Sequence, residues 1–87
     1  MQLSVEISKY PLAEVDYVSA IKHFIDRLNK HDNLTIETNV MSTQVFGEYD
    51  HVMNVLQQEL KVSFEQYGTL VFVCKFIPGN LKQKYSV

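Results

Sequence analysis

The sequence predicts an α+β domain in which strands and helices follow one another in the order β-α-β-β-α-β. Three observations lead to this prediction. Residues 2–8 alternate between polar and apolar side chains, which is the period of a strand with one buried face. Residues 15–30 and 51–67 repeat apolar side chains every three or four positions, which is typical of amphipathic helices. Segments 34–40, 43–46 and 69–77 supply the other strands.

In the first half of the chain, the strand over residues 2–8 is ended by Pro11, because proline cannot donate to a sheet ladder. A helix then runs from Val15 to about Lys30, and Asp16 or a residue just before it caps the first turn. The exit of this helix includes Asn33, which tolerates a left-handed backbone.

In the second half, residues 34–40 and 43–46 form a hairpin that stops at Gly47 and Glu48. Asp50 is the expected N-cap of the second helix, and Gly68 is its expected C-terminal stop. The side chains expected to be nearly fully buried are Leu3, Val5, Ile7, Val18, Ile21, Ile25, Leu28, Leu56 and Leu60.

The element order is that of the ferredoxin-like fold. Right-handed crossovers then place both helices on one face of a four-stranded antiparallel sheet with the strand order 4-1-3-2, and leave Ser4, Glu6 and Ser8 on the open face. The last strand, Thr69 to Ile77, lies at an edge of this sheet yet is apolar on both faces. Such an edge invites pairing with another chain. We therefore expect a homodimer or homotetramer, or cover from the C-terminal tail.

Length and composition predict a single domain over residues 1–87, with residues 78–87 as a C-terminal tail. Hydrophobic residues make up 46% of the chain and charged residues 21%, which excludes a disordered protein. The net charge of −2 argues against binding to nucleic acid, which normally rests on clustered lysine and arginine.

The expected compartment is the cytoplasm. Cys74 is the only cysteine, so no disulfide can form within the chain and a reducing environment is the default. The first twelve residues lack the basic and apolar segments of a signal peptide. No apolar stretch approaches the roughly 20 residues that span a bilayer, so no membrane contact is expected.

Several kinds of chemistry lack their motifs in this sequence. A soft-metal site needs paired cysteines, RNA-binding domains carry an open-face aromatic motif, and zinc sites need closely spaced ligands. None of these occurs, and neither does a nucleophile elbow or a phosphate loop. Cys74 fits a small buried hydrophobe better than a reactive thiol. We expect no metal, no cofactor and no catalytic residue.

Polar side chains gather instead at one end of the predicted hairpin. They are Thr38, Asn39, Ser42, Thr43 and Glu48. So many polar groups indicate either a demanding turn or a small-molecule site. The aromatic side chains of Tyr10, Phe46 and Tyr49 are close to them in the predicted topology, and Glu6 and Glu37 add negative charge. Aromatic rings with carboxylates suit a cationic aromatic ligand.

Two segments resemble the small thiamine-binding protein family related to YkoF. They are SKYPL at residues 8–12 and NVMSTQVFGEYDHVM at residues 39–53, which is similar to the family pattern M-S-T-x-V-x-G-E. The resemblance spans residues 6 to about 75. It implies a ferredoxin-like fold, binding of thiamine or its hydroxymethylpyrimidine moiety without chemistry, and assembly into dimers and tetramers.

The resemblance implies ligand-binding roles for Ser8, Tyr10, Ser42, Thr43 and Glu48, and the polar cluster itself adds Asn39. The hydroxyl and amide groups would bind the pyrimidine, Tyr10 would pack against a ring, and Glu48 would orient the ligand or balance the thiazolium charge. Two other classes stay open. One is an assembly or regulatory module without a ligand. The other is an enzyme with Glu48 as general base, although no partner histidine is near it in sequence.

Overall fold

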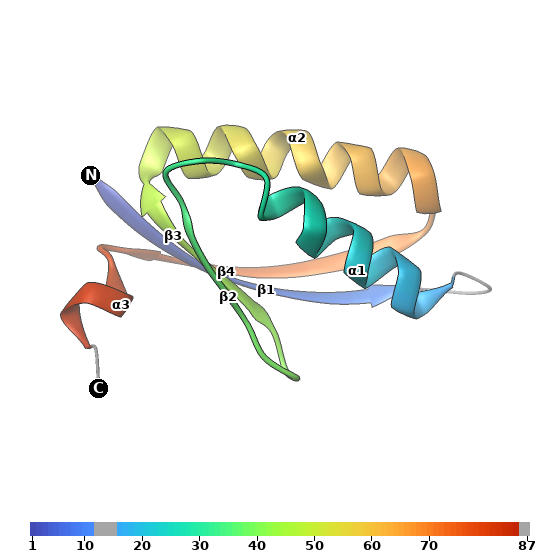
Figure 1. The fold of residues 1–87 in the computed structure, drawn as a ribbon, viewed down its shortest axis with the longest axis horizontal. Coiled ribbons are helices and arrows are strands. Elements are labelled where there is room, and N and C mark those ends of the chain that lie inside the picture. The colour runs from blue at the N-terminus through green and yellow to red at the C-terminus, as the bar shows by residue number, and fades with distance from the viewer. Residues whose placement is uncertain (12–15, 86–87) are drawn as a thin grey trace.

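The structure is a computed structural model that describes residues 1–11 and 16–85 (Figure 1). Its elements are β1 (Gln2–Pro11), α1 (Tyr17–Leu28), β2 (Thr35–Thr38), β3 (Thr43–Glu48), α2 (Tyr49–Tyr67), β4 (Leu70–Pro78) and α3 (Leu81–Lys84). No helix within these described parts of the chain is long and apolar enough to cross a bilayer.

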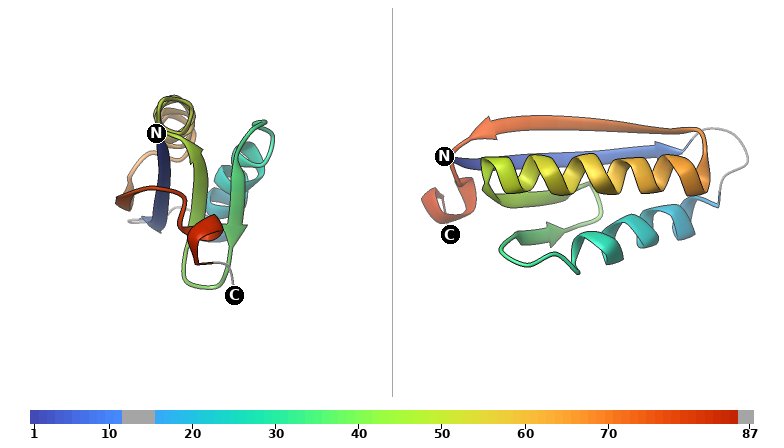
Figure 2. Two further views of the ribbon diagram at one scale, coloured as in Figure 1. Left: turned by 90° about the vertical axis from the view of Figure 1, so that its left-hand side faces the viewer. Right: turned by 90° about the horizontal axis from the view of Figure 1, so that it is seen from above.

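The four strands form one antiparallel sheet in the order β2-β3-β1-β4. This is the predicted order read from the other edge, so the predicted ferredoxin-like fold is confirmed. Both long helices cover one face of the sheet, whereas the short helix α3 lies on the other side (Figures 1 and 2). The sheet therefore has a helix-covered face and an open face, and only the end of the open face near the N-terminus is roofed.

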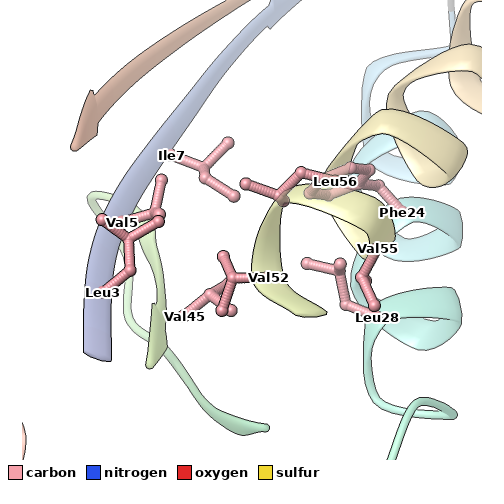
Figure 3. Close-up of a cluster of buried hydrophobic side chains, with 9 residues drawn as sticks. All are labelled: Leu3, Val5, Ile7, Phe24, Leu28, Val45, Val52, Val55 and Leu56. Atoms are coloured by element: carbon pink, nitrogen blue, oxygen red, sulfur yellow. The ribbon is translucent and has the colours of Figure 1, made fainter. Parts of the chain in front are cut away.

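Alternation along the strands decides which side chains enter the core. Leu3, Val5 and Ile7 of β1 are all buried against the helices, as predicted, and Val45 of β3 joins them (Figure 3). From the helices, the core cluster takes Phe24, Leu28, Val52, Val55 and Leu56. Two strands and two helices thus share one continuous apolar core, which fixes the sheet against the helices.

The predicted core face of α1 was confirmed at Leu28 and wrong at Val18, Ile21 and Ile25. Its buried side chains are Ala20, Phe24 and Leu28. Val18 is 70% exposed, and Ile21 and Ile25 are only half-buried, as is Leu60 on α2. The helix carries apolar residues on two adjacent stripes, and the larger ring decides which stripe faces inward. Phe24 packs against Phe72 of β4 with 5.0 Å between ring centroids.

Helix ends follow capping chemistry, with one correction. The Asp16 side chain accepts a hydrogen bond from the Ser19 backbone and caps α1, as predicted; the expected start at Val15 lies outside the described residues. Glu48, and not Asp50, is the N-cap of α2, because its carboxylate accepts from the His51 backbone. Gly68 ends α2 with a positive φ of 73°, as expected.

Two other differences lie at strand and chain ends. β1 does not stop near Ser8 but continues to Pro11, which is paired with Leu70 of β4. Proline removes one donor without preventing an extended backbone, so it is tolerated at the end of a strand. Within the segment expected as a tail, Asn80 caps the short helix α3 by accepting a hydrogen bond from the Gln83 backbone.

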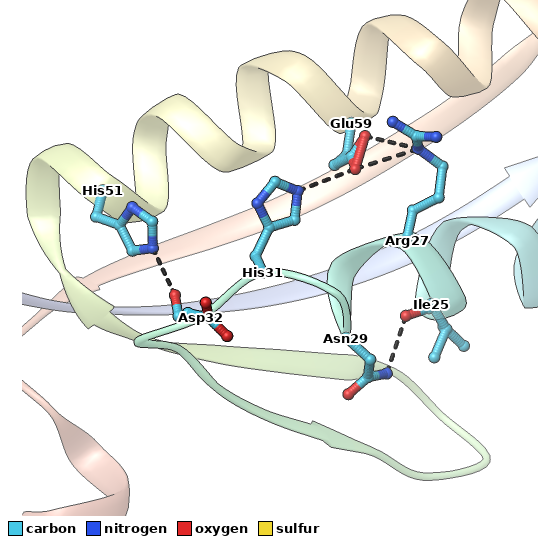
Figure 4. A network of polar contacts seen from close by, with 7 residues as sticks. All are labelled: Ile25, Arg27, Asn29, His31, Asp32, His51 and Glu59. Atoms are coloured by element: carbon cyan, nitrogen blue, oxygen red, sulfur yellow. Dashed lines mark hydrogen bonds and ion pairs between the residues drawn. The ribbon is translucent and has the colours of Figure 1, made fainter.

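A polar seam joins α1 to α2 (Figure 4). Arg27 of α1 donates to the Glu59 carboxylate at 2.8 Å, and His31 Nε2 lies 3.1 Å from its other oxygen. Burial alone would raise the pKa of Glu59, but the hydrogen bonds from Arg27 and His31 and the positive charge of Arg27 outweigh it, so the pKa lies below its usual value. The Glu59 carboxylate is therefore ionised and paired inside the fold.

Candidate functional site

The turn between β2 and β3 is built largely by one side chain. Asn39 Oδ1 accepts hydrogen bonds from the backbone N–H groups of Met41 and Ser42, at 2.8 and 3.1 Å. The Asn39 N–H also donates to the Ser42 carbonyl, which closes a tight hairpin. This is the turn chemistry expected of asparagine. It leaves Val40 and Met41 at the tip, exposed by 100% and 82%.

The hydroxyl groups that follow the turn point to different faces of the sheet. Thr43 is buried on the helix-covered face, where its hydroxyl lies 3.2 Å from that of Thr38. Ser42 instead donates at 3.0 Å to Glu6, which lies on the open face. Gln44 Nε2 in turn donates to the Ser42 hydroxyl at 2.7 Å. The turn therefore connects a buried hydroxyl on one face to a carboxylate on the other.

A crevice with a volume of about 70 Å³ lies between α1 and this turn. Four of the predicted site residues line it, namely Ser8, Asn39, Ser42 and Thr43. Its apolar lining comes from the outer stripe of α1, in particular Tyr17, Ile21 and Ile25. We call this place the turn crevice. It is smaller than a typical ligand pocket of about 300–1,000 Å³, so it can take only one edge of a ligand ring.

Lys9 is a charged side chain inside this crevice. Its Nζ lies 4.6 Å from the centre of the Phe24 ring and 3.5 Å from the carbonyl oxygen of Ile21. Burial lowers the pKa of Lys9 to about 8. No carboxylate of residues 1–11 and 16–85 pairs with Lys9. An ammonium group has three donors, so Lys9 keeps hydrogen-bonding capacity for another partner.

The other two predicted site residues lie elsewhere. Glu48 is at the far end of β3 from Thr43, about 17 Å away along an extended strand. There it caps α2, and it lies 3.9 Å from the N-terminal amine of Met1. Tyr10 follows Ser8 on β1 with its side chain 55% exposed, and it does not line the turn crevice. The structure thus brings four of the six residues to the turn crevice, although the Ser42 hydroxyl is bonded to Glu6 and the Asn39 side-chain oxygen to the turn backbone.

Three of the groups that suggested a cationic ligand also face away from the turn crevice. Glu6, Glu37 and Phe46 line a separate hollow on the open face of the sheet. Glu6 pairs there with Lys75 at 3.3 Å, and the hydrogen bond from Ser42 followed by the contact with Lys75 lowers the pKa of the Glu6 carboxyl. These groups therefore cannot act on a ligand held under α1.

Sequence reasoning missed Lys9 and the wall that α1 provides. A signal for Lys9 was present: it occupies an odd-numbered position in a strand whose odd positions, Leu3, Val5 and Ile7, all enter the core. A lysine at such a position points to the helix-covered face of the sheet, so it either lies under a helix or marks the place where the apolar core ends. The wall of Tyr17, Ile21 and Ile25 had no such signal, because those isoleucines were assigned to the core.

The arrangement suits binding more readily than metal chemistry. Within the described part of the chain, no three histidine, cysteine or acidic side chains come together as a metal site. Cys74 is half-buried in β4, where burial raises the pKa of its thiol, which makes it a poorer nucleophile. The crevice offers a buried hydroxyl, an ammonium group and apolar walls, which are groups that orient a heterocycle.

Comparisons with known proteins point to one family. The model of the YKOF-related family matches residues 2–76. A crystal structure of a Streptococcus pneumoniae protein is 21% identical, with a TM-score of 0.85 and full coverage of both chains. A Thermotoga maritima protein, described as a candidate for thiamine biosynthesis or salvage, is 17% identical, with a TM-score of 0.84 over 99% of this chain and 97% of its own.

A hypothetical protein from Methanocaldococcus jannascii is 23% identical, with a TM-score of 0.76 over 99% of this chain and 98% of its own. At these identities the three structures show a shared fold. A search of curated proteins found no match.

Proposed function

The chain belongs to the YKOF-related family, and from this premise we propose that it binds thiamine or the hydroxymethylpyrimidine moiety of thiamine without converting it. The observation that carries the proposal is the turn crevice, where Ser8, Asn39, Ser42 and Thr43 lie together beside Lys9. A structural neighbour described as a candidate for thiamine biosynthesis or salvage supports the choice of ligand.

The proposed pose follows from the chemistry of a substituted pyrimidine, which carries ring acceptors and an amino donor. Lys9 donates to a ring nitrogen, because its ammonium group has three donors and makes one long hydrogen bond and no ion pair within residues 1–11 and 16–85. The Thr43 hydroxyl serves as donor or acceptor at the floor of the crevice, and Ile21 packs against the ring. The cationic thiazolium points outward, away from Lys9, because like charges repel.

The proposal also includes an oligomer, for which the reason lies at the β4 edge of the sheet and not at the turn crevice. β4 is an edge strand, paired only with β1 in the described sheet. Its apolar side chains Val73 and Phe76 are 49% and 51% exposed. Covering such surface stabilises association by about 25 cal/mol per Å². We therefore extend the proposal to a homodimer, or a pair of dimers, formed through β4 in the cytoplasm.

Sedimentation at micromolar protein concentration tests the oligomer. Val73→Glu places a charge on the exposed apolar face of β4, and we expect it to shift the equilibrium toward monomer. Lys61→Glu changes the charge at an exposed position on α2, outside β4, and as the control it should sediment as the unmodified protein does. A single 10.1 kDa species for the unmodified chain would end this part of the proposal.

Calorimetry with thiamine and with hydroxymethylpyrimidine tests the ligand. We expect both to bind with one site per chain, because the pyrimidine is the part held in the turn crevice. A turnover assay with the same compounds should leave them unchanged, which separates a binding protein from an enzyme. If neither compound binds, the proposal is wrong.

The second candidate function is an assembly module that holds no small ligand. One observation favours it: Asn39 uses its side-chain oxygen to build the turn, with bonds to the N–H groups of both Met41 and Ser42. This candidate predicts that sedimentation shows oligomers and that calorimetry shows no binding of thiamine or hydroxymethylpyrimidine.

A further inference from the structure

A hollow of about 510 Å³ lies on the open face of the sheet, and Leu81 and Lys82 of α3 line it as a roof. The helix α3 lies on the side of the sheet opposite the two long helices (Figures 1 and 2). Ser4, which is only 3% exposed, fixes the start of this roof. Its hydroxyl donates to the Gly79 carbonyl at 2.7 Å and accepts from the Leu81 N–H at 2.9 Å. Lys82 of α3 pairs with Glu37 of β2 across the hollow. The roof is thus attached to the sheet at two places.

The floor of this hollow carries charges of both signs. One row of paired positions crosses all four strands on the open face. From β2 to β4 it consists of Glu37, Gln44, Glu6 and Lys75. Glu6 and Lys75 pair at one end of the row, and Glu37 and Lys82 pair at the other. Two carboxylates and two ammonium groups therefore line the hollow, with a net charge close to zero.

Beside the charged row lies an apolar wall with an aromatic component. Phe46 belongs to the next row of the sheet and is only 8% exposed, although it points to the open face. Ile77, Leu81 and Tyr85 complete the wall from β4 and the α3 segment. The volume lies in the range of small-molecule pockets, and the lining combines apolar surface with a few polar groups, as such pockets do.

We propose that this hollow binds a small aromatic zwitterion, of which an aromatic α-amino acid is the simplest example. The ring lies against Phe46, Leu81 and Tyr85. The ligand ammonium group pairs with a floor carboxylate, and the ligand carboxylate pairs with Lys75 or Lys82. A simple cation would meet two lysines and a simple anion two carboxylates, whereas a zwitterion finds a partner for each charge. The site is separate from the turn crevice and does not depend on the thiamine proposal.

Phenylalanine and two analogues that each keep one charge test the ligand class. Phenethylamine keeps the ammonium group and 3-phenylpropionate keeps the carboxylate. We expect calorimetry to show one phenylalanine per chain, with each analogue bound about two- to fivefold more weakly, since each loses a partly exposed ion pair. The proposal is overturned if phenylalanine shows no binding up to about 10 mM, or if either analogue binds as tightly as phenylalanine.

Variants locate the site. Lys82→Gln removes the charge on the roof without touching the core, and should weaken phenylalanine binding about two- to fivefold. Phe46→Leu removes the ring from the wall and should weaken it as well. Lys61→Gln, exposed on α2, is the matched control and should bind phenylalanine normally. Binding that is unchanged in both Lys82→Gln and Phe46→Leu would place phenylalanine elsewhere and overturn the assignment.

Thiamine titrations of the same variants keep the two proposals apart. We expect Lys82→Gln to bind thiamine as the unmodified protein does. If Lys82→Gln weakens thiamine binding and leaves phenylalanine binding unchanged, the hollow is the thiamine site and the zwitterion proposal is overturned. If phenylalanine binds with the predicted variant effects while thiamine does not bind at all, only the proposed function fails.

Discussion

Two clusters of polar side chains on the helix-covered side of the sheet differ in how far their hydrogen-bonding groups are paired. In the seam between α1 and α2, Glu59 is only 2% exposed, and both of its oxygens accept hydrogen bonds from Arg27 or His31. In the turn crevice, and within residues 1–11 and 16–85, Lys9 makes one long hydrogen bond and lies over an aromatic ring, and the buried hydroxyl of Thr43 is within hydrogen-bond distance of that of Thr38.

The difference separates polar groups that hold the fold from polar groups that are available to a ligand. A buried polar group stabilises a protein only when its hydrogen-bonding capacity is used, and it costs stability when capacity is left over. In the seam, both carboxylate oxygens of Glu59 accept hydrogen bonds, so we interpret the seam as structural. The turn crevice keeps unused donors, so we interpret it as a place where a ligand completes the set.

The largest expected effect comes from the seam. Glu59→Ala leaves Arg27 and His31 facing each other without a counter-charge. Breaking a buried pair costs about 3–5 kcal/mol, and because Arg27 is partly exposed we expect a loss of about 2–4 kcal/mol in the free energy of unfolding. Urea denaturation measures it, with exposed Glu65→Ala on the same helix as the control. A loss below about 1 kcal/mol would remove the seam as a stabilising feature.

Lowering the pH should also remove the contribution of ionised Glu59 to the free energy of unfolding. The pKa of Glu59 is lowered in the folded protein, so its ionised form stabilises the fold above the usual pKa of an unfolded glutamate. That contribution is lost as the pH falls through the lower, folded value. The stability difference between the unmodified protein and Glu59→Gln should therefore be constant near pH 7 and shrink below about pH 4. Urea denaturation from pH 7 to pH 3 measures it, and a difference independent of pH would contradict the paired carboxylate.

A substitution at Lys9 tests whether the polar groups of the turn crevice are available to a ligand. Lys9→Met keeps the length of the side chain but removes its charge, so stability should stay constant or rise, because no ion pair among the described residues is lost. Thiamine affinity should fall about tenfold, as expected for the loss of a hydrogen bond from a charged donor. Exposed Lys22→Met on α1 is the control. A stability loss with unchanged affinity would make Lys9 a structural residue.

The features that could be predicted from the sequence depend on neighbours in the chain. The inward face of β1 follows from alternation alone, and the caps at Asp16 and Gly68 follow from residue type. The phase of α1 does not, because the helix has two apolar stripes. The contact that selects one of them joins Phe24 to Phe72, which are far apart in the sequence.

The same limit applies to the candidate site. Motif residues close in sequence, Asn39, Ser42 and Thr43, do meet at the turn. Ser8 lies near them because its neighbour Ile7 is paired with Thr43. Glu48 belongs to the same motif, yet an extended strand carries it to the other end of the sheet. The partnership of Glu59 with Arg27 could not be predicted at all, because it depends on two helices lying side by side.

The central claim is that the polar groups of the turn crevice act on a ligand, and Thr43→Val tests it most directly. The change keeps the shape and the β-branching of a 1% exposed side chain and removes only its hydroxyl. We predict a loss of about 0.5–1.5 kcal/mol in thiamine binding, or about two- to tenfold in affinity, with little change in the thermal midpoint. An unchanged affinity together with a lower thermal midpoint would show that Thr43 only builds the turn, and would contradict the account.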